Sequence, residues 1–415
     1  MNEGQHRFGQ NEVSRFTLFF ALTYFVQGTI DLTSGLANQP VQYLLKEQLH
    51  LSAGQSAFFF AVIGIGWTIK PLYGAVSDFF PLAGWQRKSY LLLMSVLGMA
   101  SWLALAVLPP DYTTVLVLLT CCAATLAFCD VMIDALMVEA GRPSGLTGRF
   151  QAVQWASISL AFTVAQFAGG YLSAYAAPQT VFLLAAGFPL VTAAATLALV
   201  REPPRANSSE NVRATRVALG QAARSPALWI TAAFLFFWNF SPSLGTPLLY
   251  YQTDVLGFSK TFIGTLAALS NAAGIIGALL FFRYCRFVDL GRLLGIAVGL
   301  GVLSTLSFIS LAGPTSAVGI FFVSGLLSQI THLAVLDLAA RSCPARAEGT
   351  VFALLMSCLN IGRTGSTVIG GWLYDHVGFT LLICVSAGFT ALCWGIVPWL
   401  RANEPRGRER FSSAP

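Results

Sequence analysis

The chain is 415 residues long, with 55% of its residues in the hydrophobic set, 10% charged and a formal net charge of +6. Soluble domains carry about 25% charged residues, so this composition excludes a free cytosolic protein. A mean hydropathy of +0.68 and 38 glycines indicate helices in lipid, where glycine is more frequent than in soluble helices.

Twelve apolar segments follow one another along the chain, each near the roughly 20 residues that one membrane crossing needs. Short turn-forming separators divide most of them, such as residues 109–111, with the sequence Pro-Pro-Asp. The predicted helices cover residues 16–45, 53–75, 89–108, 113–138, 150–173, 180–200, 227–251, 261–282, 293–312, 316–339, 350–373 and 380–400.

One separator, residues 201–225, is long, polar and basic, which is typical of a linker between two halves. We therefore expect an all-α integral membrane protein with twelve transmembrane helices in two six-helix bundles. Its predicted parts are an N-terminal tail (1–15), a first bundle (16–200), the linker (201–225), a second bundle (226–400) and a C-terminal tail (401–415).

The basic residues lie almost entirely on one side of this topology. Of the 24 Lys and Arg, all but Lys46, Lys260, Lys70 and Arg363 fall in the tails, the linker and the loops of that side. The positive-inside rule then places both termini in the cytoplasm, as expected for a multi-pass protein of the inner (plasma) membrane. Because these charges are dispersed topology signals, we expect the lipid bilayer and no nucleic acid as a partner.

The chain repeats itself once. Residues 43–52 align without a gap with residues 250–259, so that Glu47 coincides with Asp254. Two six-helix halves in parallel repeat are typical of transporters whose substrate site lies at the interface of the halves.

Seven ionisable residues fall inside the predicted helices, away from their ends. A charge at bilayer depth costs at least a few kcal/mol and is kept mainly where it lines a water path or has a partner. We interpret these residues as candidates for substrate binding or proton coupling: Asp31, Lys70, Asp130, Asp134, His332, Asp337 and Arg363.

Two of these acids lie close together on one helix. Asp130 and Asp134 are four residues apart, so they share a helix face one turn from each other. Two carboxylates this close and partly desolvated are costly to ionise together. Our hypothesis is that one or more of the buried acids carries a coupling proton. In the alternative interpretation Asp134 holds Arg149 or another basic residue at the cytoplasmic gate and does not titrate.

The cations have two interpretations as well. Lys70 is either a fixed positive charge that binds an anionic group, or the counter-ion of an acid in the fourth or eleventh helix. Arg363 suits bidentate carboxylate binding, or it pairs with Asp337. We expect His332 to act as a cavity hydrogen-bonder. Four aromatic residues are candidates for stacking on a planar ligand, with packing as the alternative: Trp67, Trp155, Trp238 and Tyr250.

Several runs resemble one family. They are Trp-Thr-Ile-Lys-Pro-Leu-Tyr-Gly at 67–74, Ser-Asp at 77–78, Arg-Lys-Ser-Tyr at 87–90, Asp-Val at 130–131, Asp-Ala-Leu at 134–136, Leu-Ala-Ala-Arg at 338–341 and Phe-Ala-Leu-Leu-Met at 352–356. Together they resemble the folate-biopterin transporter family, a branch of the major facilitator superfamily. Arg363 departs from the pattern, since small or polar residues are expected there.

The resemblance implies a major facilitator fold and a secondary active carrier that works by alternating access, with folates or pterins as the expected substrates. From the hypothesis on the buried acids, protons are the expected coupling ion. The resemblance also implies a monomer without cofactor. The family's cytoplasmic loop motif corresponds to Gly74, Asp78, Arg87 and Lys88, which the resemblance assigns to a gate. The alternative interpretation of Asp134 adds Arg149 to that gate. The alternative is a major facilitator carrier for another organic solute, such as a muropeptide, a siderophore or S-adenosylmethionine.

The sequence lacks the motifs that are typical of other functional classes. We find no nucleophile-base constellation for an enzyme, no pair of His or Cys at metal-ligand spacing, and no Gly-x-x-x-x-Gly-Lys-Ser/Thr loop for ATP. We therefore expect neither an enzyme nor a bound metal.

Overall fold

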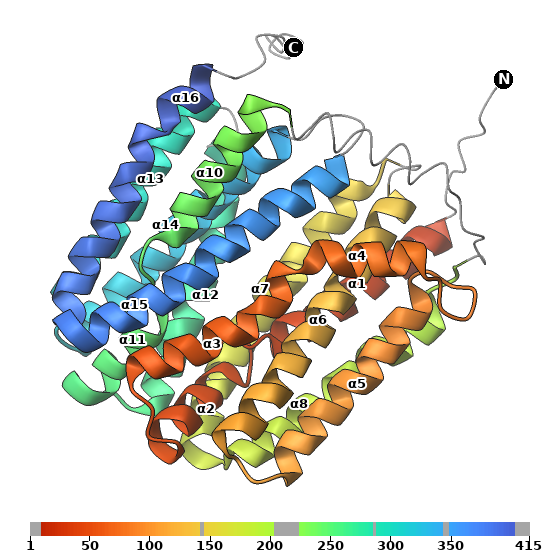
Figure 1. Cartoon of the computed structure of the whole chain (residues 1–415), viewed down its shortest axis with the longest axis horizontal. Helices are drawn as coiled ribbons and strands as arrows, with labels where there is room; N and C mark the ends of the chain where they lie inside the picture. Colours follow the sequence, from red (N-terminus) through yellow and green to blue (C-terminus); the bar gives the residue numbers. More distant parts are fainter. Residues whose placement is uncertain (1–9, 142–144, 203–223, 285–287, 343–347, 403–415) are drawn as a thin grey trace.

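The computed structural model describes residues 10–141, 145–202, 224–284, 288–342 and 348–402, and within these ranges the chain is helical with short connections (Figure 1). A single isolated bridge between Leu82 and Trp85 is the only β-type pairing in this part of the chain. Most of both predicted tails and of the predicted linker falls outside the described residues.

The N-terminal bundle contains the first six crossings. The first is broken into α1 (Gln10–Ile30), α2 (Asn38–Tyr43) and the π-helical turn η1 (Leu44–Gln48). The others are α3 (Ala53–Thr68) with α4 (Lys70–Phe79), α5 (Lys88–Val107), α6 (Tyr112–Gly141), α7 (Thr147–Tyr175) and α8 (Pro178–Leu199).

The C-terminal bundle begins with α10 (Pro226–Phe240), α11 (Gly245–Tyr250) and the π-helical turn η2 (Tyr251–Val255). It continues with α12 (Lys260–Tyr284), α13 (Leu290–Ser307) with η4 (Phe308–Ser310), and α14 (Pro314–Arg341). The last two crossings are the arms of α15 (Glu348–Leu392), extended by η5 (Cys393–Gly395) and α16 (Val397–Ala402). The arms meet at Gly378, whose φ of 78° suits glycine because it has no Cβ.

Hydropathy and geometry together account for all the predicted crossings. Nine stretches of the described chain are long and apolar enough to cross a membrane, and the last of them, 354–400, contains both arms of α15. The broken first crossing and α7 are too polar to be counted by hydropathy, yet both are helical and lie where the sequence predicts. The described chain therefore has the twelve predicted crossings.

The repeat seen in the sequence is also present in the backbone. In each bundle a six-residue helix is followed directly by a five-residue π-helical turn and then, after a short link, by a long helix. The matching elements α2 and α11, η1 and η2, and α3 and α12 start at one constant offset along the chain. The alignment of 43–52 with 250–259 is thus confirmed as a structural repeat.

Each bundle has a core of its own. In the N-terminal bundle Trp102 packs against Phe182, both almost fully buried, with ring centroids 5.9 Å apart. In the C-terminal bundle Phe234 and Leu235 are buried among residues of α13, α14 and α15. Many large apolar side chains point outward instead, such as Leu183, which is 57% exposed, as expected for a surface that faces lipid.

The bundles meet along two helix pairs, α3 with α15 and α7 with α12. At one end of the molecule these pairs approach so closely that only glycine fits. A Cβ on Gly170 of α7 would lie 2.6 Å from the Cα of Gly264 of α12, and one on Gly371 of α15 would lie 2.9 Å from the Cα of Gly54 of α3. We call this end, where η1 and η2 also lie, the far end.

Candidate substrate and proton site

A lysine and an aspartate from neighbouring helices pair inside the N-terminal bundle. Lys70 is the first residue of α4, directly after the irregular residue Ile69 that separates it from α3. Its ammonium group donates to Oδ2 of Asp130 on α6. The two side chains are 22% and 9% exposed. Of the two interpretations of Lys70, the structure shows the counter-ion of an acid in the fourth crossing.

A second carboxylate lies one helical turn away on the same face. Oδ1 of Asp134 accepts a hydrogen bond of 2.5 Å from the hydroxyl group of Tyr24 on α1. Tyr24 is buried, and nothing in the sequence distinguishes it from the others among the 11 tyrosines. We call Tyr24, Lys70, Asp130 and Asp134 the charged cluster. With both carboxylates ionised it carries one net negative charge.

Aromatic side chains connect this cluster to the bundle interface. The ammonium group of Lys70 lies 4.6 Å from the ring centroid of Trp67. The carbonyl oxygen of Trp67 accepts a hydrogen bond of 3.0 Å from Nδ2 of Asn360 on α15, in the other bundle. The charged cluster therefore lies beside the interface, where the sequence repeat predicts the substrate site.

Three more predicted residues lie at this interface. Trp155 of α7 meets His332 of α14 edge to face, with ring centroids 6.2 Å apart. Arg363 of α15 is exposed, and a Cβ on Gly64 of α3 would lie 3.6 Å from Oγ1 of its neighbour Thr364. An indole and an imidazole group thus meet across the bundle interface.

Four other predicted residues lie elsewhere. Asp31 accepts hydrogen bonds of 2.8 Å from the backbone N–H groups of Thr33 and Ser34, so it caps the break that follows α1. Asp337 pairs at 2.8 Å with Arg341 one turn along α14, whereas one sequence interpretation paired it with Arg363. Two aromatics serve packing and interface contacts: Trp238 stacks on Phe234 in the C-terminal core, and Tyr250 lies at the far end.

The predicted gate residues form contacts within the N-terminal bundle. Arg87, whose side chain is 8% exposed, pairs at 2.6 Å with Asp78 and at 3.2 Å with Glu139. The ammonium group of Lys88 donates to the carbonyl oxygen of Val200 at 3.0 Å. These contacts join α4, α5, α6 and the end of α8.

The remaining gate candidates are Gly74 and Arg149. Gly74 lies on α4, and a Cβ there would lie 3.7 Å from Val131 of α6. Arg149 is exposed near the start of α7, while Asp134, its partner in one interpretation, is bound by Tyr24. Sequence reasoning missed Glu202, whose carboxylate accepts from the backbone N–H groups of residues 86–88 and so caps α5.

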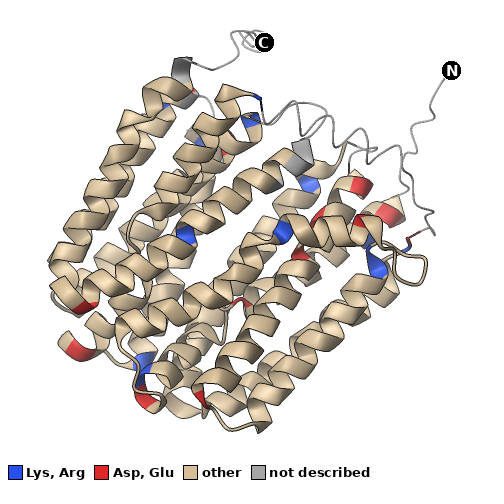
Figure 2. Ribbon diagram, in the orientation of Figure 1, with Lys and Arg blue, Asp and Glu red and all other residues tan. Residues whose placement is uncertain are grey.

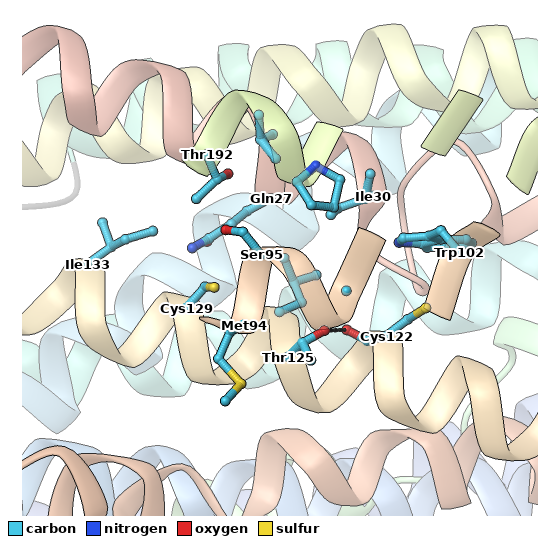
Figure 3. Close-up of a pocket in the computed structure, with 14 residues that line it drawn as sticks. Gln27, Ile30, Met94, Ser95, Trp102, Cys122, Thr125, Cys129, Ile133 and Thr192 are labelled. Atoms are coloured by element: carbon cyan, nitrogen blue, oxygen red, sulfur yellow. Dashed lines mark hydrogen bonds between the residues drawn. The ribbon is translucent and has the colours of Figure 1, made fainter. Parts of the chain in front are cut away.

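A small, partly open cavity lies inside the N-terminal bundle, lined by residues of α1, α5, α6 and α8 (Figure 3). It lies on a different face of α6 from the charged cluster. Cys129 and Ile133 line it, each one residue before an acid of the cluster and therefore about 100° around the helix. Its volume is about 20 Å³, room for about one water molecule. It is too small for an organic substrate. Among the described residues no group of three or more His, Cys, Asp or Glu could hold a metal ion.

Comparison with known proteins gives consistent results. The model of the BT1 family matches residues 31–397. A folate-biopterin transporter of Synechocystis sp. is 31% identical over 412 residues, covering 93% of this chain and 82% of the relative. Folate transporter 1 of Plasmodium falciparum is 24% identical, covering 87% of this chain and 73% of the relative.

Solved structures show the same fold at low identity. The nucleoside transporter NupG has a TM-score of 0.70 at 15% identity, covering 95% of this chain and 99% of its own. A D-xylose–proton symporter has a TM-score of 0.71 at 13% identity, covering 95% and 99%. Both are transporters, and the predicted major facilitator fold is confirmed. The chain belongs to the BT1 family and is a multi-pass membrane transporter, not an enzyme.

Proposed function

We propose that this protein carries folate or pterin-type solutes across the membrane by alternating access and couples their movement to protons. The observation that supports this most directly is the charged cluster beside Trp67 at the bundle interface. The printed names of the relatives in Synechocystis and Plasmodium point to the same substrate class.

The groups at the interface match the chemistry of such a ligand. A pterin is a planar ring with an aminopyrimidine edge, and folate adds carboxylates. Trp67 and Trp155 offer faces on which a flat ring stacks. The carboxylates of Asp130 and Asp134 accept hydrogen bonds from amino and ring N–H groups. Arg363 binds a carboxylate through its two parallel N–H donors.

Proton coupling follows from the charge of the cluster. One net negative charge in a largely desolvated site is costly, and one proton removes it. Because Asp130 already pairs with Lys70, the proton belongs on Asp134, and once neutral this carboxyl group no longer repels a substrate carboxylate that approaches Lys70. Proton binding and substrate binding would then favour each other, as a symporter requires.

The orientation and the gate belong to the same proposal. We propose that both termini face the cytoplasm in the inner (plasma) membrane, supported by the side on which nearly all Lys and Arg fall. Figure 2 shows the charged residues gathered mainly toward the ends of the helices, as expected for this arrangement. The contacts of Arg87 with Asp78 and Glu139 would form the cytoplasmic gate region, with the protein acting as a monomer.

The test is uptake of labelled folic acid and biopterin into proteoliposomes, with and without an inside-alkaline pH gradient. We expect accumulation that the gradient stimulates. Asp130→Asn and Asp134→Asn should abolish the stimulation, while Asp111→Asn should keep it, because Asp111 caps α6 in a loop outside the site.

The substrate assignment and the coupling assignment can be refuted separately. If folded protein takes up neither compound, the substrate assignment is wrong and another organic solute must be sought by ligand stabilisation. If uptake occurs but both aspartate variants keep full gradient stimulation, the assignment of coupling to the charged cluster is wrong.

A further inference from the structure

Lys46 and Lys260, the two lysines that the predicted topology places in loops on the side opposite to nearly all other basic residues, are both at the far end. Lys46 lies in η1 of the N-terminal bundle, and its ammonium group donates to Oδ1 of Asp254 in η2 of the C-terminal bundle. The same group lies 5.0 Å from the ring centroid of Tyr250, four residues before Asp254. One cation thus binds a carboxylate and a tyrosine ring of the opposite bundle.

A second contact of the same kind joins a lysine of the C-terminal bundle to an acid and a tyrosine of the N-terminal bundle. Lys260, the first residue of α12, donates at 2.6 Å to Oε2 of Glu47 in η1. Its ammonium group lies 4.1 Å from the ring centroid of Tyr43, four residues before Glu47. In the sequence repeat Tyr43 coincides with Tyr250 and Glu47 coincides with Asp254, so each bundle offers the same tyrosine and acid to a lysine of the other.

Other contacts join the bundles at the same end. Oδ2 of Asp375 on α15 accepts from the hydroxyl group of Ser52 at 2.6 Å and from the backbone N–H group of Gly54 at 2.9 Å. The hydroxyl group of Tyr250 donates to the carbonyl oxygen of Leu51 at 2.8 Å. The glycine contacts described above lie between the same helices. The far end is therefore closed, and opening it requires both lysine contacts to break.

We propose that Lys46 with Tyr250 and Asp254, and Lys260 with Tyr43 and Glu47, form a paired latch whose strength sets how often the far end opens. The inference rests on the alternating access proposed above. The side chains of Glu47 and Asp254 are about half exposed (50% and 52%), so each ion pair is weak and reversible. Weak, exposed contacts suit a gate that must open in every cycle.

The latch is tested by a distance, not by transport. With the eight native cysteines replaced, spin labels are placed at Ala177→Cys and Thr315→Cys, exposed positions at far-end helix starts in the two bundles. Pulsed electron paramagnetic resonance in nanodiscs then gives the ratio of open to closed far ends. Lys46→Met should raise this ratio about fivefold, the combined effect expected of one exposed ion pair and one cation–π contact.

Controls and opposite outcomes are built into the same measurement. The exchange Lys46→Asp with Asp254→Lys should restore most of the closed population, and 1 M salt should open the unmodified protein by screening the pairs. Glu12→Gln, which removes an exposed ion pair within α1, should change nothing. If Lys46→Met, Lys260→Met and 1 M salt all leave the ratio of open to closed far ends unchanged, the latch is refuted. A changed ratio without folate uptake supports the latch and refutes only the proposed substrate.

Discussion

The pair of Lys70 with Asp130 should show strong coupling in a double-mutant cycle. Lys70→Met keeps most of the side-chain volume but leaves the carboxylate of Asp130, a residue that is 6% exposed, without its cation. Breaking a fully buried pair costs about 3–5 kcal/mol. Because Lys70 keeps 22% of its side chain exposed, we expect about 2–4 kcal/mol of lost stability.

Replacing both partners by apolar residues should cost much less. In Lys70→Met with Asp130→Leu no charge stays buried, so the expected loss is about 1 kcal/mol or less. Asp130→Leu alone leaves the ammonium group of Lys70 without its carboxylate and should cost at least about 1 kcal/mol. The coupling energy of the cycle is then about 2 kcal/mol or more, well above the roughly 0.5 kcal/mol error of additivity. A coupling energy of this size indicates that Lys70 and Asp130 form a structural ion pair. A coupling energy near zero would mean that the two charges act independently.

The assay is thermal unfolding of the purified protein in detergent at a fixed scan rate, because membrane proteins commonly unfold irreversibly. For a chain of this size 1 kcal/mol corresponds to about 1–2 °C, extrapolating from smaller domains. Lys70→Met should therefore unfold roughly 2–8 °C below the unmodified protein, and the double variant within about 2 °C of it. Equal unfolding temperatures for the single and double variants would refute the reasoning.

Of three further predictions, two use the same unfolding assay and the third uses the spin-label distance. Tyr24→Phe removes the hydrogen bond to Asp134 and should cost about 1–2 kcal/mol; the loss should be smaller in an Asp134→Asn background, where a neutral amide oxygen replaces the charged acceptor. Phe182→Ala should cost about 3–5 kcal/mol by opening a cavity, whereas Leu183→Ala on the lipid-facing side should cost under about 1 kcal/mol, and equal costs would contradict the assigned core. Gly264→Val should separate the bundles at the far end, since its Cβ would lie 2.5 Å from a Cα of the opposite helix; an unchanged spin-label distance would show that this approach is not tight.

The sequence determined the architecture because hydropathy is a local property of the chain. Segment length predicted the crossings, the distribution of Lys and Arg indicated the expected orientation, and the repeat indicated the division into halves. It failed to predict the breaks that follow Ile30 and Phe240, because these depend on contacts such as the hydrogen bonds between Ser241 of the seventh crossing and Ser386 of α15.

The candidate site was predictable only as a list of residue types. An ionisable residue in an apolar helix is conspicuous in the sequence, so Lys70, Asp130 and Asp134 were found. Tyr24 was not, because a tyrosine in such a helix is ordinary until its hydroxyl group is seen against a carboxylate. Asp31 was expected in the site, but a short acid also caps a turn, and backbone N–H groups two and three residues later take its oxygen.

The far end shows the same division most clearly. From the sequence alone, Lys46 and Lys260 are known to depart from the charge asymmetry, and Glu47 and Asp254 are known to be equivalent in the repeat. Which lysine binds which acid depends on how the two bundles pack together. The paired residues lie more than 200 positions apart in the chain. Local patterns determine which segments enter the membrane and which residues are costly there, whereas only tertiary packing decides the partners that offset that cost.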